Sequence, residues 1–324
     1  MNISTTKLWL GLAIPLLFSL PRTSVAQTDQ DAIMMAKNNF CTGLMYTHSS
    51  WKDYWEGMYK RDNQNLGTVS TNMYAVMGNY GVTKDLNVLF GLPYVSTNSS
   101  AGTLTGQKGL QDLSLWVKWK GLEKKVKKTT YSAYILAGGS IPVSNYVIDY
   151  LPLSIGSGSR TLSGRLLLDY QRSHFFVTGS GTYTYRGNVS IDRTAYYTTT
   201  LILSNQVEMP DVASYGLRTG YRSDRLIAEA VLTGMNTLGG FDIRRNDMPF
   251  PSNKMNVLTL GVNAKYEIPW LTGLAVTGGG NYVLTGRNVG QSTTFNIGVF
   301  YVIDFSKKET NPDNIREINP KLKQ

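Results

Sequence analysis

Few residues of this sequence have side chains that could support catalysis. It contains two histidines, His48 and His174, and one cysteine, Cys41. A histidine beside a serine or a carboxylate can drive hydrolysis, but neither His48-Ser49-Ser50 nor the residues around His174 reproduce a hydrolase motif. One cysteine and two distant histidines are also too few ligands for a transition-metal site. We therefore expect no enzyme activity, no cofactor and no metal.

Several apolar segments instead have their charged side chains on one face only, that is, at positions separated by an even number of residues. In "LQDLSLWVKWK", residues 110–120, Asp112 and Lys118 fall on one side, while leucine, valine and tryptophan alternate with them. A period of two places successive side chains on opposite faces of a strand. Nine residues of this and similar segments are predicted to share the polar face: Asp112, Lys118, Lys120, Arg165, Asp169, Arg218, Asn263, Lys265 and Glu267.

The polar faces suit the wet interior of a barrel whose outer wall contacts lipid. A charge facing lipid near the bilayer midplane would cost about 2–4 kcal/mol, whereas an interior charge avoids this cost. Two interpretations of the interior charges remain open. They could line a path for solutes, or opposite charges could bridge a narrow interior and close it.

The elements that would position these residues are twelve strand-like segments. Each is about as long as the 9–11 residues with which a tilted strand crosses a bilayer, and bacterial single-chain barrels have an even number of strands. The sequence thus predicts an all-β fold, a transmembrane antiparallel up-and-down β-barrel of about 12 strands. The first segment alternates weakly. The segments are 51–61, 67–80, 87–95, 109–121, 130–141, 160–171, 175–186, 211–222, 226–237, 255–267, 273–285 and 292–305.

The connections between these segments support the same topology. Short links such as "GVTKDL", "RSH" and "SDR" alternate with connections that are mostly long, namely 96–108, 142–159, 187–210 and 238–254. Outer-membrane barrels have short periplasmic turns and longer external loops. The order of the links places both termini of the barrel in the periplasm.

Aromatic residues gather near the ends of the predicted strands. Amphipathic rings form belts at the two membrane interfaces of barrel proteins. We therefore predict that outer-membrane lipid is the partner of the outer wall. The predicted belt residues are Tyr80, Tyr94, Trp119, Tyr170, Tyr221, Tyr266 and Phe305.

The N-terminus has the features of a secretory signal peptide. Lys7 precedes an apolar run, 8–20, and Ser24-Val25-Ala26 supplies small residues before a cut between Ala26 and Gln27. The mature protein is thus expected to leave the cytoplasm and to reside in the outer membrane of a Gram-negative bacterium. The formal charge is +10, but an exported chain meets little nucleic acid, so we expect no nucleic-acid partner.

The segments divide the chain into four regions. Residues 1–26 are the signal peptide, 27–50 a plug-like or periplasmic N-terminal segment, 51–305 the barrel, and 306–324 a polar periplasmic tail. In residues 27–50, Asp29 or Asp31 could cap a short helix. The segment could fold into the lumen as a plug or remain a periplasmic leader.

One stretch of about forty residues resembles a known family. It contains Leu92-Pro93-Tyr94, a variable loop, and the pattern formed by Gly109, Asp112, Leu113, Leu115, Lys118 and Trp119. This stretch resembles the sequences of outer-membrane proteins of the MetA-pathway phenol-degradation family, which is related to the long-chain fatty acid and aromatic hydrocarbon channels. The resemblance implies a barrel that admits hydrophobic or aromatic small molecules, generally with an N-terminal plug.

The resulting expectation is a passive or gated outer-membrane channel for small hydrophobic or aromatic solutes. The alternatives are a general diffusion porin for polar solutes and a non-transporting structural or adhesion barrel. Phe305 resembles the C-terminal aromatic signal that the barrel assembly machinery recognises, although a polar tail follows it here.

Overall fold

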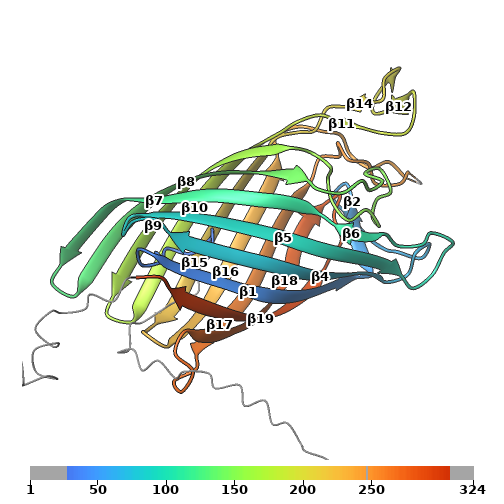
Figure 1. The fold of residues 1–324 in the computed structure, drawn as a ribbon. Coiled ribbons are helices and arrows are strands. Elements are labelled where there is room, and N and C mark those ends of the chain that lie inside the picture. The colour runs from blue at the N-terminus through green and yellow to red at the C-terminus, as the bar shows by residue number, and fades with distance from the viewer. Residues whose placement is uncertain (1–27, 246, 307–324) are drawn as a thin grey trace, which may run out of the picture.

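The structure, a computed structural model, describes residues 28–245 and 247–306. Within these residues, twelve long strands form a closed antiparallel β-barrel (Figure 1). The predicted fold class and strand number are therefore confirmed. The predicted signal peptide and the tail beyond Ser306 lie outside the described residues. No helix in the described part of the chain is long and apolar enough to cross a membrane.

The barrel strands and the short accessory strands have the following bounds. The barrel strands are β1 (Asn39–Trp51), β4 (Val69–Gly81), β5 (Leu86–Ser99), β7 (Asp112–Val126), β8 (Thr129–Pro142), β9 (Thr161–Arg172), β10 (Phe175–Arg186), β15 (Val212–Arg222), β16 (Leu226–Thr237), β17 (Asn256–Glu267), β18 (Leu274–Arg287) and β19 (Thr293–Asp304). The short strands are β2 (Asp53–Glu56), β3 (Tyr59–Asp62), β6 (Lys108–Leu110), β11 (Val189–Ser190), β12 (Tyr196–Tyr197), β13 (Leu201–Ile202) and β14 (Gln206–Val207).

The barrel closes where its first and last strands meet. β1 pairs with β19 from Asn39↔Asp304 to Ser50↔Thr293, and pairs with β4 along its other edge. β4 in turn pairs with β5 along its whole length. A closed sheet has no free edge, so the backbone groups of each strand find partners within the wall.

The two faces of the wall differ as the sequence alternation predicts. On β19, Phe295 and Ile297 point outward and are each 62% exposed, whereas Phe300 and Val302 point inward and are 6% and 8% exposed. Large apolar side chains also cover the outside of the neighbouring strands. Exposing such a surface to water is unfavourable, so this outer wall is a surface for lipid.

The prediction that residues 51–61 form the first barrel strand is wrong. Asn39–Trp51 is that strand, and 53–62 folds into the β2–β3 hairpin. Gly57 adopts a positive φ of 55° at the hairpin turn, and Lys60 and Asp53 form an ion pair at 3.0 Å across it. Charges at both odd and even positions leave this segment without an apolar face for lipid. The barrel therefore begins at Asn39 and not at residue 51.

The accessory strands lie at one end of the barrel, together with the long loops (Figure 1). This is the external end, because external loops are the long ones. The 143–160 loop folds back over the barrel mouth there. Its Leu153 is fully buried in a cluster with Leu66 and Val69, and its carbonyl accepts a 2.6 Å hydrogen bond from Thr97 Oγ1. Loop packing therefore narrows the mouth on the side of β4 and β5.

Candidate functional site

The described N-terminal segment lies inside the barrel. Residues 28–36, hereafter the plug, form a compact turn and not the predicted helix. The carboxylate of Asp31 accepts hydrogen bonds from the backbone nitrogen of Thr28 at 2.6 Å and from that of Ile33 at 3.1 Å. Aspartate side chains that form hydrogen bonds with nearby backbone groups favour turns over helix interiors. The plug interpretation of this segment is therefore the one that its position supports.

Lys118 on β7 is the main anchor of the plug. Its side chain is fully buried, and its Nζ donates to four oxygens: Thr28 O at 3.1 Å, Asp31 O at 2.5 Å, Asp31 Oδ1 at 3.0 Å and Ile33 O at 2.8 Å. A buried ammonium is tolerated only when it is paired and hydrogen-bonded. Oxygens of the plug thus replace the water molecules that would otherwise solvate the Lys118 ammonium group.

Two further side chains on the same wall hold the plug. Tyr134 on β8 donates its hydroxyl to Ala32 O at 2.9 Å. Arg165 on β9 donates to the carboxylate of Asp29 at 2.7 Å, and its guanidinium stacks over the Trp116 ring. We call Lys118, Tyr134 and Arg165 the anchoring wall. Lys118 and Arg165 bind the plug through charge-assisted hydrogen bonds, which are stronger than neutral ones such as that of Tyr134.

The electrostatics of Asp31 follow from this anchorage. Burial alone would raise the pKa of its carboxyl, but the Lys118 charge and the hydrogen bond from Thr28 outweigh burial. The net effect lowers the pKa of Asp31 below its ordinary value. Asp31 therefore stays ionised, and its ion pair with Lys118 persists at neutral pH.

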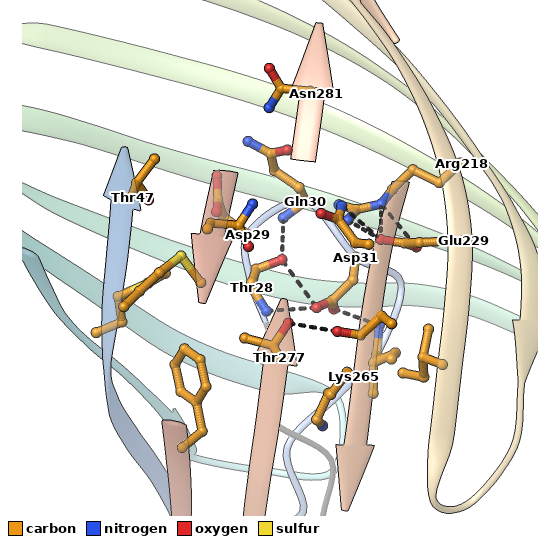
Figure 2. A pocket seen from close by; sticks show the side chains of 18 of the residues that line it. Thr28, Asp29, Gln30, Asp31, Thr47, Arg218, Glu229, Lys265, Thr277 and Asn281 are labelled. Carbon is orange, nitrogen blue, oxygen red and sulfur yellow. Dashed lines mark hydrogen bonds and ion pairs between the residues drawn. The ribbon is translucent and has the colours of Figure 1, made fainter. Parts of the chain in front are cut away.

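On its other side, the plug faces a cavity of about 320 Å³, hereafter the chamber (Figure 2). The strands across the chamber, β15–β19, β1 and β4, carry the side chains that complete it. Part of this lining is polar, namely Arg218, Arg222, Glu229, Asn263, Lys265, Thr277, Asn281, Thr294, Asn296 and Thr47. Another part is apolar, namely Met45, Met77, Ile227 and Phe300.

The chamber is the middle member of a series of three cavities. It shares Gln30 and Arg218 with a cavity of about 280 Å³ that extends towards the external end of β10 and β15. It shares Arg222 and Ile227 with a cavity of about 410 Å³ that is lined by periplasmic turn residues such as His174. The shared residues place the three cavities end to end along β15 and β16.

Most of the predicted polar-face residues lie around the plug and the chamber. Arg218 forms a bidentate pair with Glu229, and the amide of Asn263 reaches the same carboxylate at 3.4 Å. Lys265 Nζ lies 3.9 Å from Glu267 Oε1. Arg218, Glu229 and Asn263 thus form one network on three adjacent strands, and Lys265 and Glu267 form a separate pair on β17.

The remaining predicted polar-face residues lie outside the chamber. Asp169 accepts from Thr178, and pairs with Arg222 at 3.2 Å. Lys120 pairs with Asp85 at 3.3 Å and with Glu123 at 2.7 Å near the periplasmic turns. Asp112 lies at the external end of β7, where it accepts a 2.8 Å hydrogen bond from Tyr146.

Sequence reasoning missed seven of the polar wall residues of the chamber, namely Arg222, Glu229, Thr277, Asn281, Thr294, Asn296 and Thr47. Arg222 follows Arg218 by four positions and so shares its face, a signal that the alternation already contains. Glu229 and Asn281 lie among alanine and glycine, where the contrast between faces is weak. Among the described residues there is no group of three metal-ligating side chains.

The predicted belt residues lie on the outer wall. Tyr80, Tyr221 and Tyr266 are each the penultimate residue of a descending strand, next to a periplasmic turn, and are 37–44% exposed. Trp119 and Phe305 lie at the same end and are also exposed, and Tyr170 packs edge-on against Tyr131. Tyr94 is 40% exposed and lies farther towards the external end, on β5.

Comparison with known proteins shows likeness of fold only. No protein-family model and no curated protein matches the chain. The COG4313 outer membrane channel from Pseudomonas putida F1 is similar with a TM-score of 0.66 and 14% identity, over 86% of this chain and all of that one. The translocator domain of the autotransporter NalP from Neisseria meningitidis has a TM-score of 0.43, with 12% identity over 81% of this chain and 87% of that one. The TodX monoaromatic hydrocarbon channel deltaS2 mutant has a TM-score of 0.41, with 12% identity over 84% and 91%.

The fold and the outer wall define the class of this protein. It is an outer-membrane β-barrel of twelve strands, with a plug in its lumen. The family expected from the "LPY" and "GxxDLxLxxKW" patterns stays a prediction.

Proposed function

We propose that this protein is a passive or gated channel for small hydrophobic or aromatic compounds. The observation that carries the proposal is the series of three cavities that passes the plug along β15 and β16. A plug that filled the lumen would leave no such series. Solutes would enter between the external loops, pass the plug through the chamber, and leave near the periplasmic turns.

The apolar part of the chamber supports the proposed substrate class. Met45, Met77 and Phe300 come from three adjacent strands and present thioether and ring surfaces to the same cavity. Methionine adapts to ligands of different shapes and makes favourable contacts with aromatic rings. A narrow barrel also disfavours bulk diffusion, because aqueous porin channels are formed by about 16–18 strands.

A second candidate function is diffusion of small polar solutes. The observation that favours it is the group of uncharged amides and hydroxyls in the chamber, to which Asn263, Asn281 and Asn296 contribute. These groups can replace the water around a sugar hydroxyl. The two candidates differ in whether the apolar or the amide lining decides what passes.

Tracer entry into proteoliposomes separates the two candidates. The probes are arabinose and two aromatic ions that do not cross bilayers unaided, benzenesulfonate and benzyltrimethylammonium, with the membrane potential held at zero by potassium and valinomycin. We expect at least one aromatic probe to enter faster than arabinose. Arabinose entry as fast as both aromatic probes would favour a general porin. Entry of none would indicate a barrel that does not transport and would contradict the proposal.

A further inference from the structure

The periplasmic end of the β7–β8 hairpin carries four lysines that the proposed channel does not use, namely Lys124, Lys125, Lys127 and Lys128. They line none of the three cavities, and their turn lies at the end of the barrel opposite the accessory strands (Figure 1). We propose that this part of the hairpin, residues 122–131 and hereafter the basic hairpin, binds the headgroups of anionic phospholipids at the periplasmic face of the membrane. The inference concerns the outside of the barrel and does not depend on the proposed function.

One edge of the basic hairpin has no neighbouring strand. β7 pairs with β5 only as far as Trp119, and Lys120 then donates its N–H to the carbonyl of Asp85 in the β4–β5 turn at 2.9 Å. From Leu122 to Val126, the pairing of β7 within the described residues is with β8 alone. Residues 121–128 are all exposed. The hairpin therefore extends past the β4–β5 turn and is accessible at the membrane interface.

The four lysines are not neutralised by nearby carboxylates. No acidic residue occurs in the sequence from Lys124 to Tyr131, and within the part of the chain that the structure describes none of the four lysines forms an ion pair. Glu123 and Asp85, which lie at the start of the hairpin, pair with Lys120 at 2.7 Å and 3.3 Å. The basic hairpin thus presents a local excess of positive charge, which attracts an anionic surface.

The outward face of β7 indicates which kind of anion the lysines meet. Trp119, a predicted belt residue, is followed on this face by Leu122, Lys124 and Val126, after a bulge between Lys120 and Leu122. Leu122 and Val126 are large, exposed apolar side chains. At a lipid interface such groups can enter the hydrocarbon while a lysine beside them extends its ammonium to the headgroups. A polyanion in water would leave both apolar side chains exposed to solvent, which is unfavourable.

The strand register places Lys124 beside two tyrosines of the outer wall. Lys124 pairs with Tyr131, Tyr131 pairs with Tyr170 on β9, and the two tyrosine rings pack edge to face with their centroids 5.5 Å apart. Belt tyrosines lie at the level of the lipid headgroups. Because adjacent strands are about 4.8 Å apart, the Lys124 side chain can reach the same headgroup layer. Lys127 and Lys128 lie just beyond it, in the turn.

Three other periplasmic turns lack this combination of features. The β4–β5 turn contains one lysine, Lys84, which lies 3.8 Å from the carboxylate of Asp85. The β15–β16 turn contains Asp224 and Arg225, whose charges are opposite, and the β17–β18 turn, 268–273, contains no charged residue. The excess of positive charge beside exposed apolar groups therefore distinguishes the basic hairpin from these turns.

The test measures which phospholipid the mature protein retains in detergent solution. The probes are dioleoylphosphatidylglycerol, which is anionic, and dioleoylphosphatidylcholine, which is zwitterionic and has the same acyl chains. Native mass spectrometry, after addition of both lipids in equal amounts, counts those that stay bound. A lysine near an anionic lipid surface contributes about a fivefold gain in affinity, so we expect phosphatidylglycerol to be retained at least about tenfold better. The combined variant Lys124→Gln, Lys127→Asn, Lys128→Gln should lose most of this preference.

The substitutions are chosen to leave the barrel intact. Lys127 has a φ of 53°, a conformation that asparagine adopts more readily than most residues, and the other two lysines are exposed. Resistance of each variant to unfolding in detergent before heating shows that the barrel has formed. Lys124→Gln alone should reduce the preference several-fold. Its matched control is Lys84→Gln, which removes a lysine whose side chain is 89% exposed from the β4–β5 turn and should leave the preference unchanged.

A second measurement needs no variant. Raising the concentration of ammonium acetate from about 0.1 M to about 0.5 M shortens the Debye length from about 10 Å to about 4 Å. Because the lysines are exposed, salt should screen their attraction for phosphatidylglycerol. The unmodified protein should then lose most of its preference.

The outcomes decide the inference without reference to transport. Equal retention of both lipids by the unmodified protein would overturn it, and so would a preference that survives in the combined variant. Equal losses in Lys124→Gln and Lys84→Gln would show that total charge, and not the basic hairpin, attracts the lipid. Cosedimentation with purified peptidoglycan that the combined variant loses, without any lipid preference, would assign the lysines to the cell wall instead. Loss of the preference in the combined variant and at high salt, with Lys84→Gln unaffected, supports the site.

Discussion

The two sides of the lumen differ in how they contact the plug. On the anchoring wall, Lys118, Tyr134 and Arg165 donate hydrogen bonds to plug oxygens. On the other side, hereafter the open wall (β15–β19 and β1), a cavity of about 320 Å³ separates the plug from the strands. The plug is thus fastened to one wall, and it does not fill the barrel.

This difference shows how a narrow barrel can hold a plug and still keep a pathway. Buried charges are costly to separate once paired, because removing one partner leaves the other uncompensated. Concentrating such pairs on β7–β9 fixes the plug firmly. The open wall can then vary its amides, threonines and glycines to suit a solute with little effect on the plug. Anchorage thus lies on β7–β9, and the proposed path for solutes lies along other strands.

The largest expected effect comes from breaking the anchoring wall at Lys118. Lys118→Met removes the ammonium that donates to Thr28 O, Asp31 O and Ile33 O and leaves the Asp31 carboxylate without its charged partner, at a cost of about 3–5 kcal/mol if the plug stays in place. We therefore expect the plug to leave the lumen and the single-channel conductance to rise several-fold. Planar-bilayer recordings measure this directly.

A matched variant is Lys120→Met, two residues along the same strand. Lys120 pairs with Asp85 and Glu123, and among the described residues it forms no hydrogen bond or ion pair with the plug. Its conductance should stay within the range of the unmodified protein. A similar rise in both variants would mean that loss of a lysine, and not loss of the anchor, opens the lumen.

The next effect concerns the point where the plug joins the barrel. At Gly81, a Cβ atom would lie 2.0 Å from the carbonyl oxygen of Ala36, and Asn38 donates its N–H to Gly81 O at 2.8 Å. The methyl group added by Gly81→Ala must therefore displace Ala36, at the end of the plug, away from β4. We expect a loss of stability of about 1–3 kcal/mol, as for other overpacked sites. Urea unfolding in detergent measures the loss, and Gly164→Ala, where nothing lies within 4 Å, is its control.

A smaller effect should follow from acid. The pKa of Asp31 is lowered in the folded protein, so its stabilising contribution is complete above the unfolded value of about 3.9 and is lost as pH falls through the folded pKa. Conductance should stay constant from pH 7 to about pH 4 and rise only below it. In Asp31→Asn the carboxylate is absent, and this acid-induced rise should be missing. A rise already at pH 6 would contradict the assignment of Asp31 to the anchor.

The smallest effect is expected on the open wall. Asn281→Ala changes a chamber residue without an anchor to the plug, so the stability should change by at most about 0.5 kcal/mol. The conductance should change less than twofold, while the ratio of arabinose to benzenesulfonate entry shifts towards the aromatic probe. A large gain in conductance would show that the open wall also restrains the plug.

The barrel itself could be predicted from the sequence because the same alternation of outward and inward residues recurs in one strand after another. Alternating residues such as Phe295 and Ile297 repeat the same signal on each strand, and the count of twelve followed. β1 was misplaced because His48, Thr47 and the serines after it weaken the contrast between its faces. The aromatic residues of 51–61 gave this segment the composition of one barrel strand, but the turn at Gly57 divides it.

The plug contacts could not be predicted in the same way. Lys118 was assigned to the polar face, but nothing local shows that its partners are Thr28, Asp31 and Ile33, more than eighty residues earlier. Which carboxylate pairs with which cation depends on barrel closure and strand register. The chamber likewise exists only once β15–β19 and β1 are placed opposite the plug.

The end of the last strand has a consequence for the order of assembly. Phe305 donates its backbone N–H to Asn38 O at 2.9 Å, immediately after the Asn39↔Asp304 rung of the β1–β19 seam. A residue held by the assembly machinery through its backbone cannot make this bond at the same time. If the assembly machinery binds Phe305 in this way, as predicted, the final rung can form only after the machinery releases it, and release and completion of the seam are then one event.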